Sequence, residues 1–185
     1  MKTRRAADEH SIVSGTDIKP LRTRGFGYLG EIRLTAQRSD WPDILRETAM
    51  EVFSTMVGVA LTVPEESAIS LMAHVTGMVG IAGPLSAILT LRCREAAAIK
   101  LASQMLGVSL EDAATQKCDA VGEICNIVAG LFKAKIGFGD SCCLSVPTVI
   151  IGKDYKIRAA GNDERLELQF LCERDDIWIA LDIRP

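Results

Sequence analysis

The sequence predicts an α+β fold made of two copies of one unit, a helix followed by three strands, related by a pseudo-twofold axis. Two observations support this prediction. Helical and strand-like segments follow each other in the order helix, three strands, helix, helix, three strands. A pattern of polar residues and glycine in the first helix also recurs in a later one at a constant offset of 72 residues. We therefore expect an antiparallel-rich sheet packed against helices, with halves at residues 39–107 and 108–185.

The first half begins with a helix, whose start is marked by the capping residues Ser39 or Asp40 and by Pro42 in its first turn. The short run VALTV follows it. Two strand-like segments, AISLMAHVTGMVG and GPLSAILTLRC, come next and are joined through residues 80–84. The helix formers in REAAAIKLASQML then predict a helix that ends at Gly107.

The second half repeats this order with a longer connection after its main helix. SLEDAA starts a short turn or helix, and the apolar stretch CDAVGEICNIVAGLFKAKIG, residues 118–137, supplies the long helix. CCLSVPTVII is predicted to be one strand, and LELQFLCE and IWIALDI form two more around the turn RDD. The tetrapeptide LTVP at residues 61–64 matches LSVP at residues 144–147, which strengthens the case for a repeat.

The composition is that of a globular domain and excludes several functional classes. The chain has 185 residues, of which 48% are hydrophobic and 24% are charged. A net charge of −3 argues against the clustered basic surface that nucleic-acid binding requires. Apolar runs are interrupted before they reach the length of a membrane helix, and the N-terminus has no signal-peptide core. We expect a cytoplasmic protein that neither binds nucleic acid nor inserts into a membrane.

Residues 1–38 differ from the rest and are expected to form an extended or flexible N-terminal arm, which leaves residues 39–185 as the folded domain. The first 30 residues carry six basic and three acidic side chains without a sustained apolar period. GFGYLG at residues 25–30 matches the G-x-G-x-x-G dinucleotide fingerprint, yet no hydrophobic strand precedes it and no helix follows it. A flexible arm or an edge hairpin is therefore favoured over a phosphate-binding loop.

The six cysteines do not form a recognisable metal or disulfide framework. They contain no C-x-x-C pair, and only two histidines are available to join them. We expect no metal site, and we expect reduced cysteines that behave as small buried hydrophobic residues. Cys142 and Cys143 are neighbours on a predicted strand and should face opposite sides of it.

The long helix of the second half carries polar residues along one side. Asp119, Glu123, Asn126 and Gly130 follow each other at intervals of four, three and four, which places them on one stripe. The opposite side is apolar and contains Val121, Ile124, Cys125, Val128, Leu131 and Phe132. A solvated helix face is the simplest interpretation. However, glycine inside an exposed helix costs about 1 kcal/mol relative to alanine, so Gly130 and the repeat favour a surface that a partner approaches closely.

The pattern D-x-x-x-E-x-x-N, followed about twenty residues later by proline, resembles the signature of the CheC, CheX and FliY phosphatases of bacterial chemotaxis. Asp119, Glu123, Asn126 and Pro147 match it in order, and the resemblance covers roughly residues 40–185, closest to CheX-like members. It implies hydrolysis of the aspartyl phosphate of a response-regulator receiver domain such as CheY. By this resemblance Asn126 orients the attacking water and Glu123 pairs with a lysine of the receiver. Mg²⁺ would come with the receiver, so no intrinsic cofactor is implied.

The resemblance assigns supporting roles to Asp119, near the predicted helix start, and to Pro147, which fixes a neighbouring strand. In the first helix the pattern is degenerate. Glu47 replaces the leading aspartate, Glu51 keeps the acid, and Ser54 stands in place of asparagine. A hydroxyl is shorter than an amide and lacks its fixed pair of donor and acceptor, so we expect one competent site, on the second long helix.

Two other functions stay open at this point. One is a non-catalytic CheX-like module that docks on a receiver or on a signalling or motor protein through the same stripe. The other is a hydrolase of small phosphoesters, although the sequence offers it no cluster of metal ligands. The resemblance further implies a homodimer, for which IWIALDI and the hairpin near Gly80 could supply free sheet edges.

Overall fold

The computed structural model describes residues 36–65, 73–153, 155 and 164–184, and the G-x-G-x-x-G match and most of the predicted arm lie outside these ranges. The helical elements are η1 Arg38–Asp40, α1 Trp41–Val52, η2 Phe53–Val57, α2 Glu95–Leu106 and α3 Leu110–Lys135. The strands are β1 Leu61–Thr62, β2 Val75–Ala82, β3 Ala87–Cys93, β4 Cys143–Leu144, β5 Thr148–Ile151, β6 Glu164–Cys172 and β7 Asp175–Ile183. Within this part of the chain, no helix is both long enough and apolar enough to cross a bilayer.

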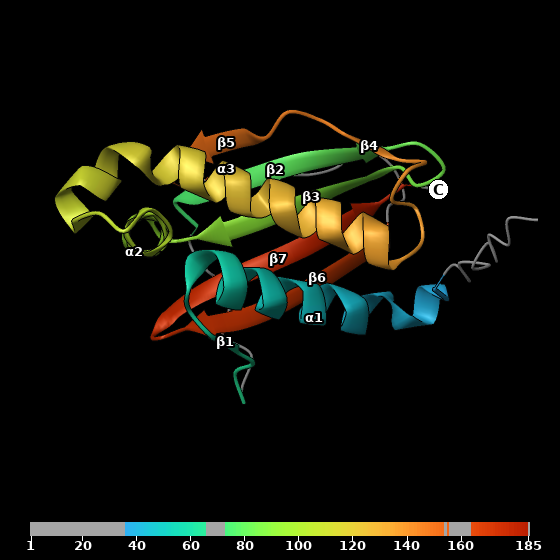
Figure 1. Ribbon diagram of the computed structural model, residues 1–185, viewed down its shortest axis with the longest axis horizontal. Coiled ribbons are helices and arrows are strands. Elements are labelled where there is room, and N and C mark those ends of the chain that lie inside the picture. Colours follow the sequence, from blue (N-terminus) through green and yellow to red (C-terminus); the bar gives the residue numbers. More distant parts are fainter. Residues whose placement is uncertain (1–35, 66–72, 154, 156–163, 185) are drawn as a thin grey trace, which may run out of the picture. The chain divides into compact units, whose positions relative to one another are not determined.

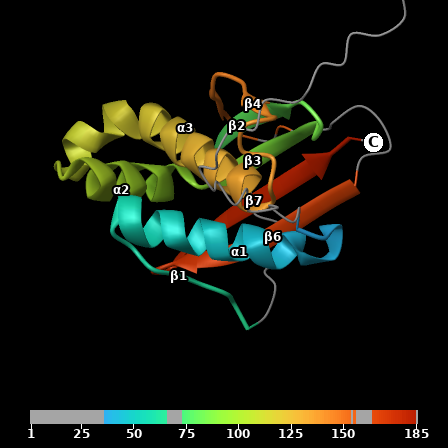
Figure 2. The same ribbon diagram turned by 45° about the vertical axis from the view of Figure 1, so that its right-hand side comes forward.

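The strands form one seven-stranded sheet in the order β1-β6-β7-β3-β2-β4, and β5 pairs with β2 beside β4. Each pairing is antiparallel. The long helices lie on one face of this sheet, with α3 over β2 and β3 and α1 near β6 (Figures 1 and 2). The predicted α+β class, with an antiparallel sheet packed against helices, is therefore confirmed.

The strand order follows a pattern that a duplicated unit would produce. The β2–β3 and β6–β7 hairpins meet at the centre, where β3 pairs with β7. Each short strand then pairs with the hairpin of the other half, since β1 pairs with β6 and β4 with β2. Leu61 of LTVP pairs with Cys172, and Leu144 of LSVP pairs with Ile81. The two tetrapeptides thus occupy opposite edges of the sheet, while the pseudo-twofold axis itself stays an interpretation.

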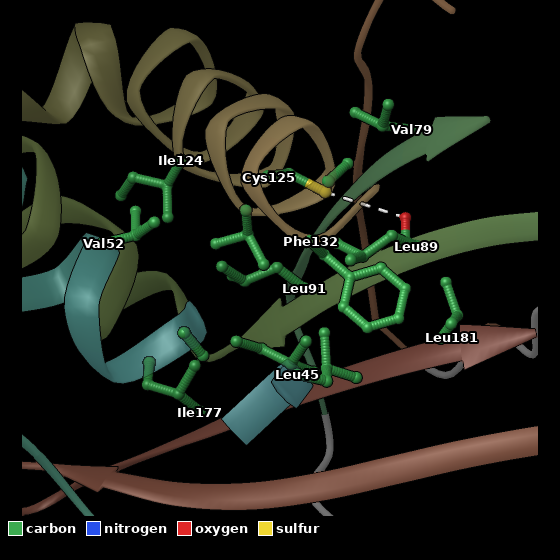
Figure 3. Packing of buried hydrophobic residues seen from close by; sticks show 14 of the residues in the cluster. Leu45, Val52, Val79, Leu89, Leu91, Ile124, Cys125, Phe132, Ile177 and Leu181 are labelled. Carbon is green, nitrogen blue, oxygen red and sulfur yellow. Dashed lines mark hydrogen bonds between the residues drawn. The ribbon is translucent and has the colours of Figure 1, made fainter. Parts of the chain in front are cut away.

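The hydrophobic core fills the space between the sheet and the helices (Figure 3). Phe132 of α3 is fully buried there and meets the ring of Trp41 edge-on, with 6.0 Å between ring centroids. Four cysteines belong to this core, namely Cys93, Cys125, Cys142 and Cys172, and burial raises the pKa of the Cys93 and Cys125 thiols to about 12. The Cys125 thiol also donates to the Leu89 carbonyl oxygen at 3.7 Å. The four core cysteines behave as the small buried hydrophobic residues that the sequence predicts, whereas Cys118 is half-buried and Cys143 is exposed, so for these two the prediction is wrong.

Several predicted element boundaries agree with the structure. Pro42 lies in the first turn of α1, although the Asp40 side chain makes no capping hydrogen bond. Gly107 ends α2 in the left-handed conformation, with φ of 66°. Cys142 is buried and Cys143 is exposed, although Cys142 precedes β4 and, contrary to the prediction, is not part of a strand.

The main helix of the second half starts earlier than predicted. SLEDAA is not a separate turn or helix, because α3 runs without a break from Leu110 to Lys135. Ser109 caps it, and its side-chain oxygen accepts from the Asp112 backbone N–H at 3.1 Å. Asp119 therefore lies well inside the helix, so its predicted position near the start is wrong.

The strands depart from the prediction in three places. CCLSVPTVII is divided into β4 and β5, because Pro147 has no N–H for a sheet ladder, and the second half therefore has four strands. Gly80 lies inside β2, opposite Ile88, and the turn follows at residues 83–86. IWIALDI belongs to β7, which lies between β6 and β3 and is not a sheet edge. β2, which contains Gly80, pairs with β3 on one side and with β4 and β5 on the other. The two edges proposed for a dimer are thus wrong, and the homodimer itself stays a prediction.

Candidate functional site

The candidate site is the polar stripe of α3, which faces away from the core as predicted. The apolar side of α3 packs on the sheet: Val121, Ile124, Cys125, Val128 and Phe132 are buried, and Leu131 is half-buried. Close packing is possible because Gly77 of β2 lies under the helix. A Cβ atom there would lie 3.0 Å from Val121 Cγ1 and 3.2 Å from the Val121 carbonyl oxygen. On the opposite side, Asp119 and Glu123 are exposed and Asn126 is half-buried.

The polar groups of this stripe are free to meet a partner. Among the hydrogen bonds and ion pairs between described residues, none uses the side chain of Asp119, Glu123 or Asn126. The lysines before and after them on α3 are engaged elsewhere. Lys117 pairs with Glu95 of α2 at 3.4 Å, and Lys133 donates to the Gly139 carbonyl oxygen. Two carboxylates therefore face solvent beside a carboxamide, and no described residue supplies a neutralising cation, an arrangement suited to a positively charged side chain.

A hollow of about 360 Å³ adjoins the first half of the stripe. Its lining consists of Cys118, Asp119, Gly122, Glu123, Pro147 and Val149. The hollow brings Pro147 together with both acids, although 24 residues separate it from Glu123. Asn126 does not line it and lies one helical turn further along α3. The hollow thus brings together Asp119, Glu123 and Pro147, and Asn126 lies beside it on the same helix.

Gly122 is the residue that the sequence reasoning missed. A Cβ atom at this position would lie 3.4 Å from both Pro147 Cβ and Val149 Cγ2, so the β4–β5 connection packs directly on the helix backbone here. The signal was present in the sequence, because a glycine in a helix interior immediately before Glu123 is unfavourable without a packing reason.

Gly130 has enough space around it for a side chain among the described residues. A Cβ atom there would meet only Leu144 Cδ1, at 3.6 Å, which is ordinary van der Waals contact. Nothing in the described part of the chain therefore requires glycine at this position. The close approach of a partner at Gly130 stays a prediction.

The corresponding stripe of the first half is different in structure. Glu47 and Ser54 are exposed, but the Glu51 carboxylate pairs with Lys135 Nζ at 2.6 Å. Ser54 lies in η2, a π-helical turn that follows α1, whereas Asn126 lies inside the continuous helix α3. Gly58 ends η2 with φ of 79°, whereas Gly130 lies inside α3. The two matching sets of residues therefore differ in structure, because the acid of the first is paired and its glycine ends a helix.

The described residues do not provide a metal centre of their own. Nowhere in the described ranges do three His, Cys, Asp or Glu side chains gather so that they could hold an ion. The stripe contributes two carboxylates on adjacent turns and one amide, a set that can form hydrogen bonds and ion pairs with another molecule.

Comparison with known protein families matches the family described as chemotaxis phosphatase CheX to residues 75–171, which is more than half of the chain. The matched range contains the stripe of α3 and Pro147, and it begins after α1. No protein with a curated description shows significant similarity to this chain.

Solved structures with the same fold include three from chemotaxis systems. A CheC-like superfamily protein from Shewanella sp. PV-4 has a TM-score of 0.68 and 21% identity over 80% of this chain and 100% of that chain. The chemotaxis protein CheX from Desulfovibrio desulfuricans has a TM-score of 0.67 and 21% identity over 78% and 99%. A CheX–CheY–BeF₃–Mg²⁺ complex from Borrelia burgdorferi has a TM-score of 0.65 and 22% identity over 80% and 100%.

Proposed function

The chain belongs to the CheX family of chemotaxis phosphatases, and from this premise we propose that it hydrolyses the aspartyl phosphate of a receiver domain. The observation that carries the proposal is the exposed stripe of α3, where Asp119, Glu123 and Asn126 are free of partners within the described part of the chain. A CheX protein of the same fold was crystallised with CheY, which favours a receiver as the substrate.

Asn126 is the residue that we assign to the attacking water. Hydrolysis of an acyl phosphate breaks the bond between phosphorus and the carboxylate oxygen, and water supplies the new oxygen of inorganic phosphate. The protein contributes mainly by holding that water in line with the leaving carboxylate. A carboxamide can do this because its oxygen accepts a hydrogen bond from the water while its NH₂ donates to a phosphoryl oxygen. No residue of this chain becomes covalently bound in this scheme.

Glu123 is the residue that we assign to docking within the receiver's active site. It lies one turn from Asn126 on the same face, so both side chains can enter one pocket without a change in the helix. Its carboxylate, which has no cation beside it in the described structure, would pair with the receiver's lysine. When bound, Mg²⁺ neutralises charge on the phosphoryl oxygens, and we assign its ligands to the receiver. Asp119 and Pro147 support this arrangement at the border of the hollow.

The test of this function is the lifetime of phosphorylated receivers. Each receiver domain of the host is phosphorylated with acetyl phosphate, freed of the donor, and followed by phosphate release with and without this protein. We expect at least one receiver to lose its phosphate many times faster. Binding without acceleration for every receiver would contradict the proposal and identify a docking module instead. The predicted cytoplasmic location is part of the same proposal, since enzyme and receiver must share a compartment.

A further inference from the structure

The stripe of α3 has an apolar border on one side. Pro147 and Val149 line the same hollow as Asp119 and Glu123. β5 lies alongside α3 at one edge of the sheet (Figure 1). Ile151 is on the same face of β5 as Val149, because side chains alternate along a strand. The connection and strand from residue 146 to residue 151 therefore flank the part of α3 that carries both acids.

Two side chains of this border are open to solvent. Val146 is 84% exposed, the highest value among the exposed large hydrophobic residues of the described part, and Ile151 is 54% exposed. A single exposed valine needs no explanation. Two apolar side chains that flank an unpaired acidic stripe form a mixed surface, with apolar contact area next to polar groups, as in protein interfaces.

Val146 is also held in place by its neighbours. The Ser145 backbone N–H donates to the Gly80 carbonyl oxygen at 2.8 Å, and the Gly80 N–H donates to Ser145 Oγ at 2.8 Å. On the other side, Pro147 packs on Gly122 of α3. The backbone on both sides of Val146 is thus fixed, so little backbone freedom is lost when a partner covers this side chain, which favours affinity.

The first half offers a matched comparison. Val63 occupies the same place in LTVP that Val146 occupies in LSVP, and it is also exposed, at 55%. It follows β1 at the opposite edge of the sheet. Among the described residues the first half has no strand equivalent to β5, and its Glu51 is paired with Lys135. An exposed valine thus occurs at both edges. Of the two, only Val146 is followed by a proline that lines the hollow beside Asp119 and Glu123.

We propose that Val146 and Ile151 form the apolar anchor on which the phosphorylated receiver docks while α3 enters its active site. The inference rests on the proposed function, since the same partner supplies the phosphoryl group. The part of the receiver that covers this anchor is an apolar patch beside its phosphorylation pocket. Asp119 and Glu123 orient the receiver, Glu123 pairs with its active-site lysine, and the anchor adds contact area that excludes water.

The experiment compares Val146→Ser with Val63→Ser in the full chain. Both side chains are exposed, so the folded structure tolerates either change. The receiver that gives the strongest response is loaded with beryllofluoride and Mg²⁺, and its dissociation constant is measured by calorimetry. We expect Val146→Ser to weaken binding about tenfold and Val63→Ser to leave it within about twofold. Ile151→Ser should weaken binding in the same direction.

Turnover distinguishes this inference from the function on which it rests. With the receiver at saturating concentration, Val146→Ser should retain the wild-type rate constant for phosphate release, while the half-saturating concentration rises. Equal affinity of Val146→Ser and wild type would overturn the anchor and leave the phosphatase assignment standing. An equal loss for Val63→Ser would also overturn it. If wild type binds the beryllofluoride-loaded receiver tightly but does not accelerate phosphate release from the phosphorylated receiver, and Val146→Ser weakens that binding, the anchor stands and the phosphatase assignment fails.

Discussion

The two halves of the chain place matching tetrapeptides at opposite edges of one sheet, yet the acidic side chains on their helices α1 and α3 have different surroundings. In the second half, α3 leaves Asp119 and Glu123 exposed, with no partner among the described residues. In the first half, Glu51 of α1 pairs with Lys135 of α3. The same residue types therefore contribute to contacts within the protein on one helix and remain available to a partner on the other.

This difference suggests how a duplicated unit can retain a single site. Where asparagine has been replaced by Ser54, the acid one turn earlier is used for contact with the other half. Such a partly exposed ion pair contributes only about 0–1 kcal/mol, so stability is a weak reason for its presence. The first helix also ends in the π-helical turn η2, which contains Ser54, whereas α3 continues without a break past Asn126.

The largest expected effect comes from Asn126. Asn126→Ala should lower the rate of phosphate release from the receiver by about 100-fold, because the attacking water loses the group that holds it in line. Ser54→Ala is the matched change in the first half and should leave the rate at the wild-type value. Single-turnover decay of a phosphorylated receiver measures both. A loss with Ser54→Ala comparable to that with Asn126→Ala would mean that the halves are functionally equivalent.

The next effect concerns how closely α3 lies on the sheet. Gly77→Ala would place a methyl group 3.0 Å from Val121 Cγ1 and 3.2 Å from the Val121 carbonyl oxygen, so the helix must shift. We expect the free energy of unfolding to fall by about 1–3 kcal/mol. Gly130→Ala is the control, since its methyl group would meet only Leu144, at 3.6 Å, and helix propensity favours alanine there. Urea denaturation measures both, and equal stability of the two variants would contradict this packing account.

The smallest expected effect is a difference in receiver binding between changes at Glu123 of α3 and at Glu51 of α1. Glu123→Gln should weaken binding of the receiver about tenfold, since the receiver's lysine would lose its charged partner. Glu51→Gln removes the pair with Lys135 and should change stability by less than about 1 kcal/mol without altering affinity. Calorimetric titration with a beryllofluoride-loaded receiver separates them. A tenfold loss of affinity for Glu51→Gln would show that the first stripe also contacts the partner.

Local signals in the sequence identified several element ends, although they missed Ser109 as the cap that starts α3. Pro42 marked the first turn of α1, Gly107 marked the end of α2, and the apolar side of α3 was correctly assigned from its period. Pairing between distant strands could not be inferred in this way. IWIALDI has the same composition at an edge or at the centre, and its central place depends on partners in β3 and β6.

Spacing alone predicted that Asp119, Glu123 and Asn126 share one face of α3 turned away from the core, and in the structure the first two are exposed and Asn126 is half-buried. Their functional roles stay a prediction. The hollow beside them could not be foreseen, because it depends on Pro147 and Val149 packing on Gly122. The pairing of Glu51 with Lys135 was equally hidden, since 84 residues separate the two side chains. Contacts of this range follow from the folded arrangement and leave no local pattern.

The most direct test exchanges the two decisive residues in one chain, with Asn126→Ser and Ser54→Asn together. Phosphate release from the receiver is then measured at saturating concentration, after confirming that the variant binds the receiver as wild type does. We expect release to remain as slow as for Asn126→Ala, because Glu51 is paired with Lys135 and Ser54 lies in the π-helical turn η2. Release at the wild-type rate would contradict the assignment of the site to α3.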